Sequence, residues 1–244
     1  MSTTAAARAT ALAGLSGGVQ VVELSDVLDE NTILWPGAPA YKVEDVATYD
    51  NGGYHARYVS AFEHAGTHFD APEHFVEGGE TTADVAADSL VLHAVVIDIT
   101  AQAAQDPNYV LTADDVARFE SEHGQIPAGS AVLLRSDWSL RKPDANRYAG
   151  DPLAFPGFGV DGASVLVERG VVGVGVDTLG IDPGSVPEFT VHREVTHPAG
   201  LWHLENLINL DQLPPTGTLL FVGVPRVGGA TGFPTRVLAL VPAS

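Results

Sequence analysis

The chain has 244 residues, of which 31 are acidic and 12 are basic, so its formal net charge is −19. This length predicts one domain, and 45% hydrophobic against 18% charged residues excludes a disordered acidic chain. The negative charge argues against nucleic acid or an anionic membrane surface as the main partner, because phosphate binding needs clustered Lys and Arg. The absence of cysteine excludes disulfides and thiolate metal sites.

Residues 1–18 are mostly Ala, Thr, Ser and Gly, with a single Arg and only a short apolar part. This composition predicts a flexible N-terminal tail rather than a secretion signal, followed by one domain over residues 19–244. No apolar run approaches the roughly 20 residues that cross a bilayer. We therefore expect a cytoplasmic protein without a membrane partner.

Short runs of Val, Ile and Leu bounded by turn residues predict most of the strands, and sheet should outweigh helix. In chain order, the predicted strands are 20–24, 54–62, 94–99, 131–135, 171–176 and 219–224. Helices are predicted over 112–123 and 161–169, each ending at a glycine, and long loops over 137–158 and 182–199. This order indicates an α/β or α+β single domain with a mixed sheet, and loops of that length are often functional.

The most informative segment places His64, His68, Asp70 and His74 within eleven residues. Imidazole and carboxylate are the donors that a divalent first-row metal accepts without thiolates, and Gly66 allows the turn that lets them converge. Two imidazoles and one carboxylate leave coordination positions open for water and substrate, as in a catalytic site. His74 is then available as general base and acid, because imidazole titrates near neutral pH.

Other interpretations of the chain are possible from its residues. The histidines could be surface or core residues, or a coordinatively closed metal could clamp the loops of a binding module, in which case His74 would be superfluous. A serine hydrolase has little support because the Gly-x-Ser-x-Gly elbow is absent. Nucleotide binding lacks a full Gly-rich fingerprint or phosphate loop.

The segment from His64 to His74, His-x-Gly-Thr-His-x-Asp-x-Pro-x-His, resembles the signature of the cyclase-like metal-dependent hydrolases. Members of that family include bacterial kynurenine formamidases and isatin hydrolases. The resemblance extends over nearly all of the chain after Gly18, through Trp-Pro-Gly-Ala-Pro at 35–39, Phe-Pro-Gly-Phe at 155–158, the segment 174–182 and Leu-Glu-Asn-Leu at 204–207. It implies a swivelling β/β/α fold and a homodimer or higher homo-oligomer.

The resemblance also implies roles for the motif residues. The positions matching His64 and His68 bind metal, the position matching Asp70 binds metal and can bridge two ions, and the position matching His74 is the catalytic acid and base. Thr67 and Glu73 are either partners that orient a metal ligand or turn residues.

Members of the family with two metals recruit a downstream His and a Glu, which here would be His192 and Glu205. Thirteen positions separate them, one more than the usual family spacing, and His197 and His203 are rival candidates. Glu205 is the firmer assignment because its Leu-Glu-Asn-Leu context matches directly.

Aromatic residues near these motifs are candidates for substrate binding: Trp35, Phe62 and Phe69, with Phe75, Phe158 and Trp202 as further residues that could line an apolar pocket. Asp177 and Asp182 are read as turn-capping residues.

Together these features predict a metal-dependent hydrolase of the carbon–nitrogen bond in a small aromatic formamide or cyclic amide, of the isatin or N-formylkynurenine kind. A lactone hydrolase or a polyketide-type cyclase of the same family is the alternative. The ligand types suit Mn and Zn equally, and one or two ions per chain remain open.

Overall fold

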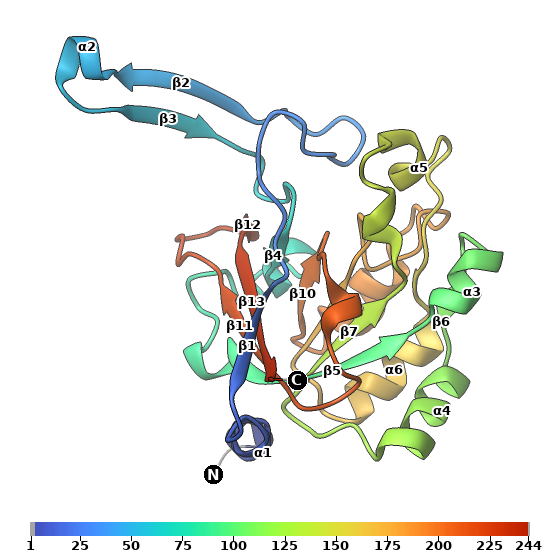
Figure 1. Cartoon of the computed structure of the whole chain (residues 1–244). Coiled ribbons are helices and arrows are strands. Elements are labelled where there is room, and N and C mark those ends of the chain that lie inside the picture. The colour runs from blue at the N-terminus through green and yellow to red at the C-terminus, as the bar shows by residue number, and fades with distance from the viewer. Residues whose placement is uncertain (1–2, 244) are drawn as a thin grey trace.

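A mixed sheet dominates the computed structural model, which describes residues 3–243 (Figure 1). Within those residues the sheet has nine strands in the order β1-β13-β11-β5-β7-β9-β10-β4-β12. Strands β5, β7, β9 and β10 are parallel neighbours, whereas the pairings on either side of them are antiparallel. The bounds are β1 Val19–Glu23, β4 His68–Asp70, β5 Val91–Asp98, β7 Ala131–Arg135, β9 Gly173–Val176, β10 Trp202–Glu205, β11 Thr218–Gly223, β12 Gly232–Pro234 and β13 Arg236–Pro242. The predicted α/β fold with a mixed sheet is confirmed.

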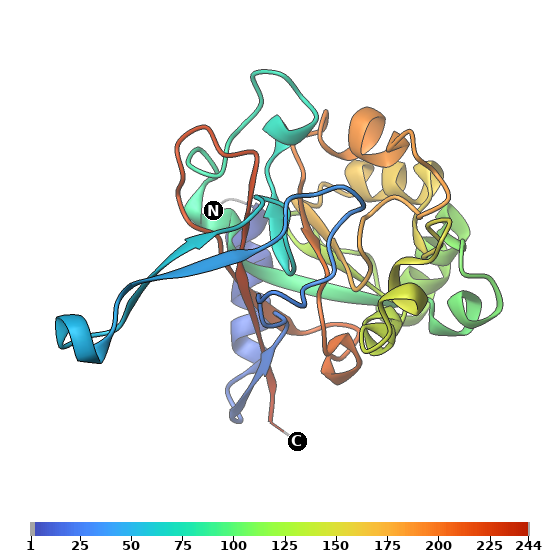
Figure 2. The same cartoon turned by 90° about the horizontal axis from the view of Figure 1, so that it is seen from above.

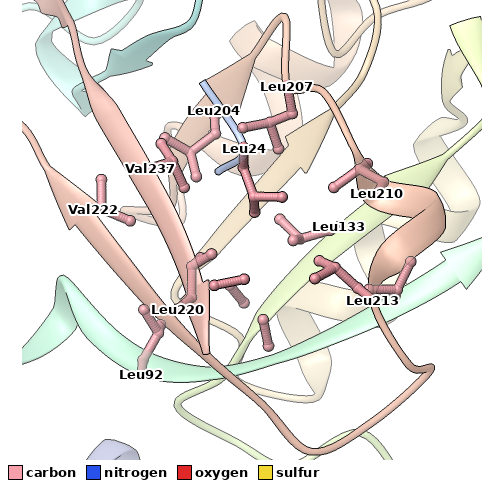
Figure 3. Packing of buried hydrophobic residues seen from close by; sticks show 14 of the residues in the cluster. Leu24, Leu92, Leu133, Leu204, Leu207, Leu210, Leu213, Leu220, Val222 and Val237 are labelled. Atoms are coloured by element: carbon pink, nitrogen blue, oxygen red, sulfur yellow. The ribbon is translucent and has the colours of Figure 1, made fainter. Parts of the chain in front are cut away.

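The central strands are apolar on both faces, because each face of the sheet is covered. On β5, Val95 and Ile97 pack toward the helices, whereas Ala94 and Val96 belong to the cluster on the other face. The second cluster is leucine-rich and includes Leu24, Leu92, Leu133, Leu204 and Leu220 (Figure 3). Continuous apolar runs of this kind are typical of strands buried on both sides.

The helices that cover the face of Val95 and Ile97 lie beside β5 and β7 (Figure 1). They are α3 Thr100–Gln105, α4 Ala113–His123 and α6 Val160–Glu168. The predicted start of α4 is confirmed: Thr112 precedes the helix, its hydroxyl accepts from the Asp115 backbone N–H at 3.2 Å, and Asp115 accepts from the Thr112 N–H at 2.9 Å. This reciprocal capping satisfies two donors that a helix start leaves unpaired.

The N-terminal segment is not the flexible tail that composition predicted. Helix α1 spans Thr3–Gly14 and buries Ala7 and Ala11 against β5 and β11. The Arg8 guanidinium also donates to the Val91 carbonyl at 3.0 Å. The prediction was wrong because alanine has the highest helix propensity and a narrow alanine face is apolar enough to pack on a sheet.

A two-stranded arm leaves the body of the molecule, as Figures 1 and 2 show. It consists of β2 Lys42–Ala47, α2 Tyr49–Gly52 and β3 Ala56–Ser60. The remaining elements are short: β6 Val110–Leu111, β8 Gly157–Phe158, α5 Ala145–Ala149, the 3-10 helices η1 Pro72–His74, η2 Ala87–Ser89, η3 Trp138–Arg141 and η5 Leu210–Gln212, and the π-helix η4 Val191–Thr196. Both predicted long loops thus contain short helices. Between residues 3 and 243, no helix combines the length and apolar character needed to cross a membrane.

Candidate active site

Strand β4 carries the centre of the histidine motif and lies between β10 and β12. Side chains alternate along a strand, so His68 and Asp70 share one face and Phe69 lies on the other. In the antiparallel pairing with β10, Glu205 is opposite His68 and His203 is opposite Asp70. The sheet register therefore gathers two histidines and two carboxylates, from segments far apart in sequence, on one face.

Asp70 is the hub of the first cluster. One of its oxygens, Oδ1, lies 2.7 Å from His64 Nδ1 and 3.1 Å from His68 Nε2. Gly66 makes this approach possible by adopting a φ of 62°, which turns the chain between the two histidines. His68 and Asp70 are buried and His64 is half-buried.

The outer nitrogens of these imidazoles are already used as donors. His68 Nδ1 is 2.9 Å from the Gly66 carbonyl, which can only accept, and His64 Nε2 is 3.0 Å from the Thr231 hydroxyl. That hydroxyl donates to Glu63 at 2.7 Å, so it accepts from His64. In the neutral rings, His64 Nδ1 and His68 Nε2 consequently present lone pairs to the Asp70 carboxylate.

Facing acceptors of this kind need a cation between them, and the donor set fits a divalent metal. The electrostatics agree. Burial favours a higher pKa for Asp70, but His68 and His64 hold the pKa of its carboxyl well below the usual range. Burial lowers the pKa of His68, but Asp70 and Glu205 outweigh it and raise that pKa to about 9. The cluster thus attracts positive charge.

A second side of the cluster is built by His192 and Glu205. His192 Nε2 lies 3.3 Å from Glu205 Oε1 and 3.7 Å from the other Asp70 oxygen, Oδ2. Glu205 Oε2 lies 3.4 Å from His68 Nε2, so both carboxylates stand between the two sides. The Asp182 carboxylate orients His192 by accepting from its ring Nδ1–H at 2.5 Å and its backbone N–H at 3.1 Å.

His74 stands next to this cluster at the end of η1. Its ring stacks on His64, with the centroids 3.8 Å apart and the planes 23° apart. Burial lowers the pKa of His74 to about 3, against a smaller raising effect of Asp70. The imidazole is therefore neutral near pH 7 and can accept a proton.

A cavity of about 850 Å³ opens onto these side chains. Its polar floor consists of His64, His68, Asp70, His74, His192 and Glu205. Its apolar wall includes Trp35, Phe62, Phe75, Leu179, Val186 and Phe189. Trp35 is held against Phe189, with ring centroids 5.3 Å apart, and against the edge of Phe155 at 6.3 Å. This size and lining suit a small aromatic ligand.

The predicted aromatic residues divide between wall and core. Trp35, Phe62 and Phe75 line the cavity, whereas Phe69 does not: it is fully buried on the opposite face of β4, with its ring 5.6 Å from that of Trp202. The substrate-binding role predicted for Phe69 is wrong because strand alternation turns it away from its two neighbours. Phe158 and Trp202 are core residues for the same kind of reason.

Two contributions to the site were not predicted. Asp182 has the capping role expected of it, because it accepts from the backbone N–H groups of Val191 and His192. Its contact with the His192 ring was not predicted, since ten positions separate the two residues. Thr231, which accepts from His64, comes from the loop before β12 and has no sequence signal. His197 and His203 were rivals of His192, and the structure brings both close to it, with ring centroids 5.5 and 4.7 Å away.

Comparison with known proteins identifies the family. Residues 22–183, more than half of the chain, match the sequence model described as "Putative cyclase". The chain belongs to this family. It is 34% identical to an isatin hydrolase from Roseibium aggregatum over 93% of the chain and 94% of that relative. It is 25% identical to a kynurenine formamidase from Bacillus cereus over 89% of the chain and 95% of that relative.

The fold of this cyclase-family chain is also that of a solved isatin hydrolase bound to the product analogue thioisatinate. The TM-score is 0.87 at 32% sequence identity, and the match covers 100% of both chains. The resemblance predicted from the His64 to His74 signature is confirmed, and the chain is an enzyme, a cyclase-family hydrolase.

Proposed function

We propose that this enzyme hydrolyses the carbon–nitrogen bond of a small aromatic amide, either a cyclic amide of the isatin type or an N-formyl aromatic amine. The observation that carries the proposal is the cavity, whose floor is the His, Asp and Glu cluster and whose wall is aromatic. The relatives named isatin hydrolase and kynurenine formamidase support the two substrate classes.

His64, His68 and Asp70 would hold a divalent metal ion, with His192 and Glu205 beside Asp70 as the ligands of a second. A bound ion of this kind polarises a carbonyl oxygen and lowers the pKa of coordinated water to about 7. Mn and Zn both suit imidazole and carboxylate ligands. Because the donor atoms form the floor of an open cavity, the site favours catalysis over a coordinatively closed structural role.

His74 is the proposed proton carrier. Its lowered pKa leaves a free lone pair at neutral pH, and its ring lines the cavity floor, stacked on that of His64. In the proposed reaction, His74 accepts a proton from the attacking water and donates it to the nitrogen that leaves as the amide bond breaks. The products are a carboxylic acid and an amine, or one ring-opened amino acid.

Trp35 and Phe62 would position the aromatic ring of the substrate. Trp35 is held in place by Phe155 and Phe189, so little side-chain entropy is lost when a ligand packs on it. Phe62 lies against His64, with ring centroids 5.5 Å apart, and links the apolar wall to the polar floor.

The test uses proton release at constant pH from isatin-like amides, N-formyl aromatic amines and unsaturated lactones. We expect amide hydrolysis that disappears on chelation and returns with Mn or Zn. His74→Asn should lower kcat by about 10²- to 10⁴-fold with the metal content unchanged, while His123→Asn, at the end of α4, serves as the matched control. Full turnover by the His74 variant, or turnover of lactones alone, would refute the proposal.

A homo-oligomer is part of the same proposal, supported by the two-stranded arm. A lone hairpin is marginally stable in water, yet this one exposes Val46, Tyr49, Tyr58 and Val59 by 49–75% of their surfaces. Apolar side chains gathered on an arm favour burial against another copy. Light scattering should show an oligomer, and Tyr58→Lys combined with Val59→Lys should shift it toward monomer; a wild-type monomer would contradict the assignment.

A further inference from the structure

The wall of the cavity carries one side chain with a permanent positive charge. Among the residues that the structure describes, Arg193 is the only Lys or Arg that lines the cavity. It lies in η4 directly after His192, whose ring belongs to the floor. The negatively charged residues of the lining are Asp70, Glu73, Glu77, Asp182 and Glu205. Arg193 is therefore the side chain of this lining that can attract a negatively charged group of a ligand.

The guanidinium of Arg193 has no acidic partner. Among residues 3–243 its side chain forms no ion pair and no hydrogen bond, and its one recorded contact is with an aromatic ring. Other arginines of the chain are paired: Arg135 donates to Asp137 at 2.7 Å, and Arg169 donates to Glu120 at 2.8 Å. Acidic residues are plentiful, at 31 against 12 basic ones. The unpaired N–H donors of Arg193 are consequently available to a ligand.

The ring of Phe75 holds this guanidinium against the cavity wall. Arg193 Cζ lies 4.9 Å from the centroid of the Phe75 ring, within the range of a cation–π contact. Phe75 itself packs on His192 and Phe189, with ring centroids 4.8 and 5.6 Å apart. A guanidinium that stacks on a ring keeps the N–H groups at its edge free. Because the stack already restricts the side chain, less rotamer freedom is lost when Arg193 binds an anion.

We propose that Arg193 binds a carboxylate carried by the substrate, so that the enzyme prefers aromatic amides with a negatively charged substituent. This inference rests on the proposed function and deepens it, because it narrows the substrate class to anionic aromatic amides. A planar guanidinium matches a carboxylate, with which it forms paired, parallel hydrogen bonds. Glu73 and Glu77 line the same cavity, and their negative charges disfavour an anion beside them. The substituent is thereby restricted to the side of Arg193.

The expected effect is on substrate affinity. A contact with a substituent outside the reacting amide is present in the bound substrate and in the transition state alike, so it lowers KM and leaves kcat unchanged. Arg193 is exposed, so the contact is screened by salt. For a charge-assisted hydrogen bond in such a position, the expected gain in affinity is about 10-fold.

The test measures kcat and KM of the metal-loaded enzyme for ortho-, meta- and para-formamidobenzoate, each beside the neutral formamidobenzamide of the same geometry. In the wild type, at least one carboxylate isomer should have a KM about 10-fold below that of its carboxamide. Arg193→Met keeps a stem that packs on Phe75 and should abolish this preference by raising the KM of the anionic substrate, with kcat nearly unchanged. Arg193→Lys keeps the charge without the planar fork and should retain part of the preference.

Arg141→Met is the matched control. The Arg141 guanidinium also stacks on an aromatic ring, with Cζ 3.4 Å from the ring centroid of Trp138, but Arg141 does not line the cavity. This variant should keep the preference of the wild type. Equal KM values within every pair of carboxylate and carboxamide, or a preference that survives in Arg193→Met, would overturn the inference while hydrolysis itself still supports the proposed function.

Calorimetry separates the inference from the proposed function. Aminobenzoates and aminobenzamides have no formyl group to lose, so their binding to the metal-loaded protein does not depend on hydrolysis. Arg193→Met should bind at least one aminobenzoate isomer about 10-fold more weakly than the wild type and the aminobenzamides equally well. This difference without hydrolysis of any amide would refute only the function. Identical affinities of the wild type and Arg193→Met for all aminobenzoates would overturn the inference.

Discussion

Gly173 is the point where the packing of the core can be tested most directly against the geometry of the site. It pairs with Trp202 across β9 and β10. A Cβ added at Gly173 would lie 2.3 Å from two atoms of the Trp202 ring and 2.4 Å from a third. The ring is 3% exposed and rests on Phe69, which sits between His68 and Asp70. A side chain at Gly173 would overlap the space that the indole occupies.

Gly173→Ala therefore forces the indole to retreat by about an ångström in a close-packed interior. Such overpacking costs about 1–3 kcal/mol. For a domain of this size, each kcal/mol lowers Tm by about 2–4 °C, so the expected loss is about 2–12 °C. The displaced ring would push on Phe69, so the affinity for metal should fall as well.

Thermal unfolding of the protein, freed of metal with a chelator, measures the loss in Tm. The matched control is Gly228→Ala, because a Cβ at Gly228 meets nothing within 4 Å. Trp202→Leu, which removes the fused ring, should make the loss caused by Gly173→Ala smaller in the double variant than the sum of the single losses. Equal Tm values for Gly173→Ala and Gly228→Ala, or strictly additive losses in the double variant, would refute the reasoning.

Three further perturbations address the site, the N-terminus and a buried histidine. Asp182→Asn removes one of the two carboxylate oxygens that accept from His192 and Val191. The variant should bind metal about 10- to 100-fold more weakly in a chelator competition. Unchanged metal affinity would contradict the orienting role of Asp182. Ala11→Asp buries a charge under α1 and should free the helix, so trypsin should cleave at Arg8 faster than in the wild type, and equal rates would show that α1 does not dock. Burial lowers the pKa of His93, so as the pH falls below about 6.5 the unfolded chain takes up a proton before the folded one does. The wild type should therefore lose stability relative to His93→Gln as the pH falls. Urea midpoints that diverge in the opposite sense would disprove this.

The sequence predicted the framework because its signals are local. Thr112 and Gly124 bracket α4 as a cap and a stop, and apolar runs such as 131–135 fall on β7. Two of the missed elements have weak local signals, although the apolar strand β13 does not. Strand β4 has only three residues, and α1 resembles a tail in composition because alanine faces carry little hydrophobic contrast.

The residues of the candidate site also divide into those with a local sequence signal and those without one. Spacing alone brought forward His64, His68, Asp70 and His74, since these residues lie within one turn, one short strand and the 3-10 helix that follows it. The residues that contact them from other parts of the chain could not be predicted, because their positions depend on the register of the sheet and on the π-helix η4. Glu205 is opposite His68 only through the pairing of β4 with β10, and Thr231 reaches His64 through the loop before β12.

The three downstream histidines show why a residue list is insufficient for assigning ligands. Sequence spacing made His192, His197 and His203 alternatives for a single position. In the structure His192 lines the cavity and its Nε2 faces Glu205 and Asp70, whereas His197 and His203 stack on each other in the buried interior. The ligand position of His192 is set by Asp182, because a carboxylate that accepts from Nδ1–H leaves the lone pair on Nε2.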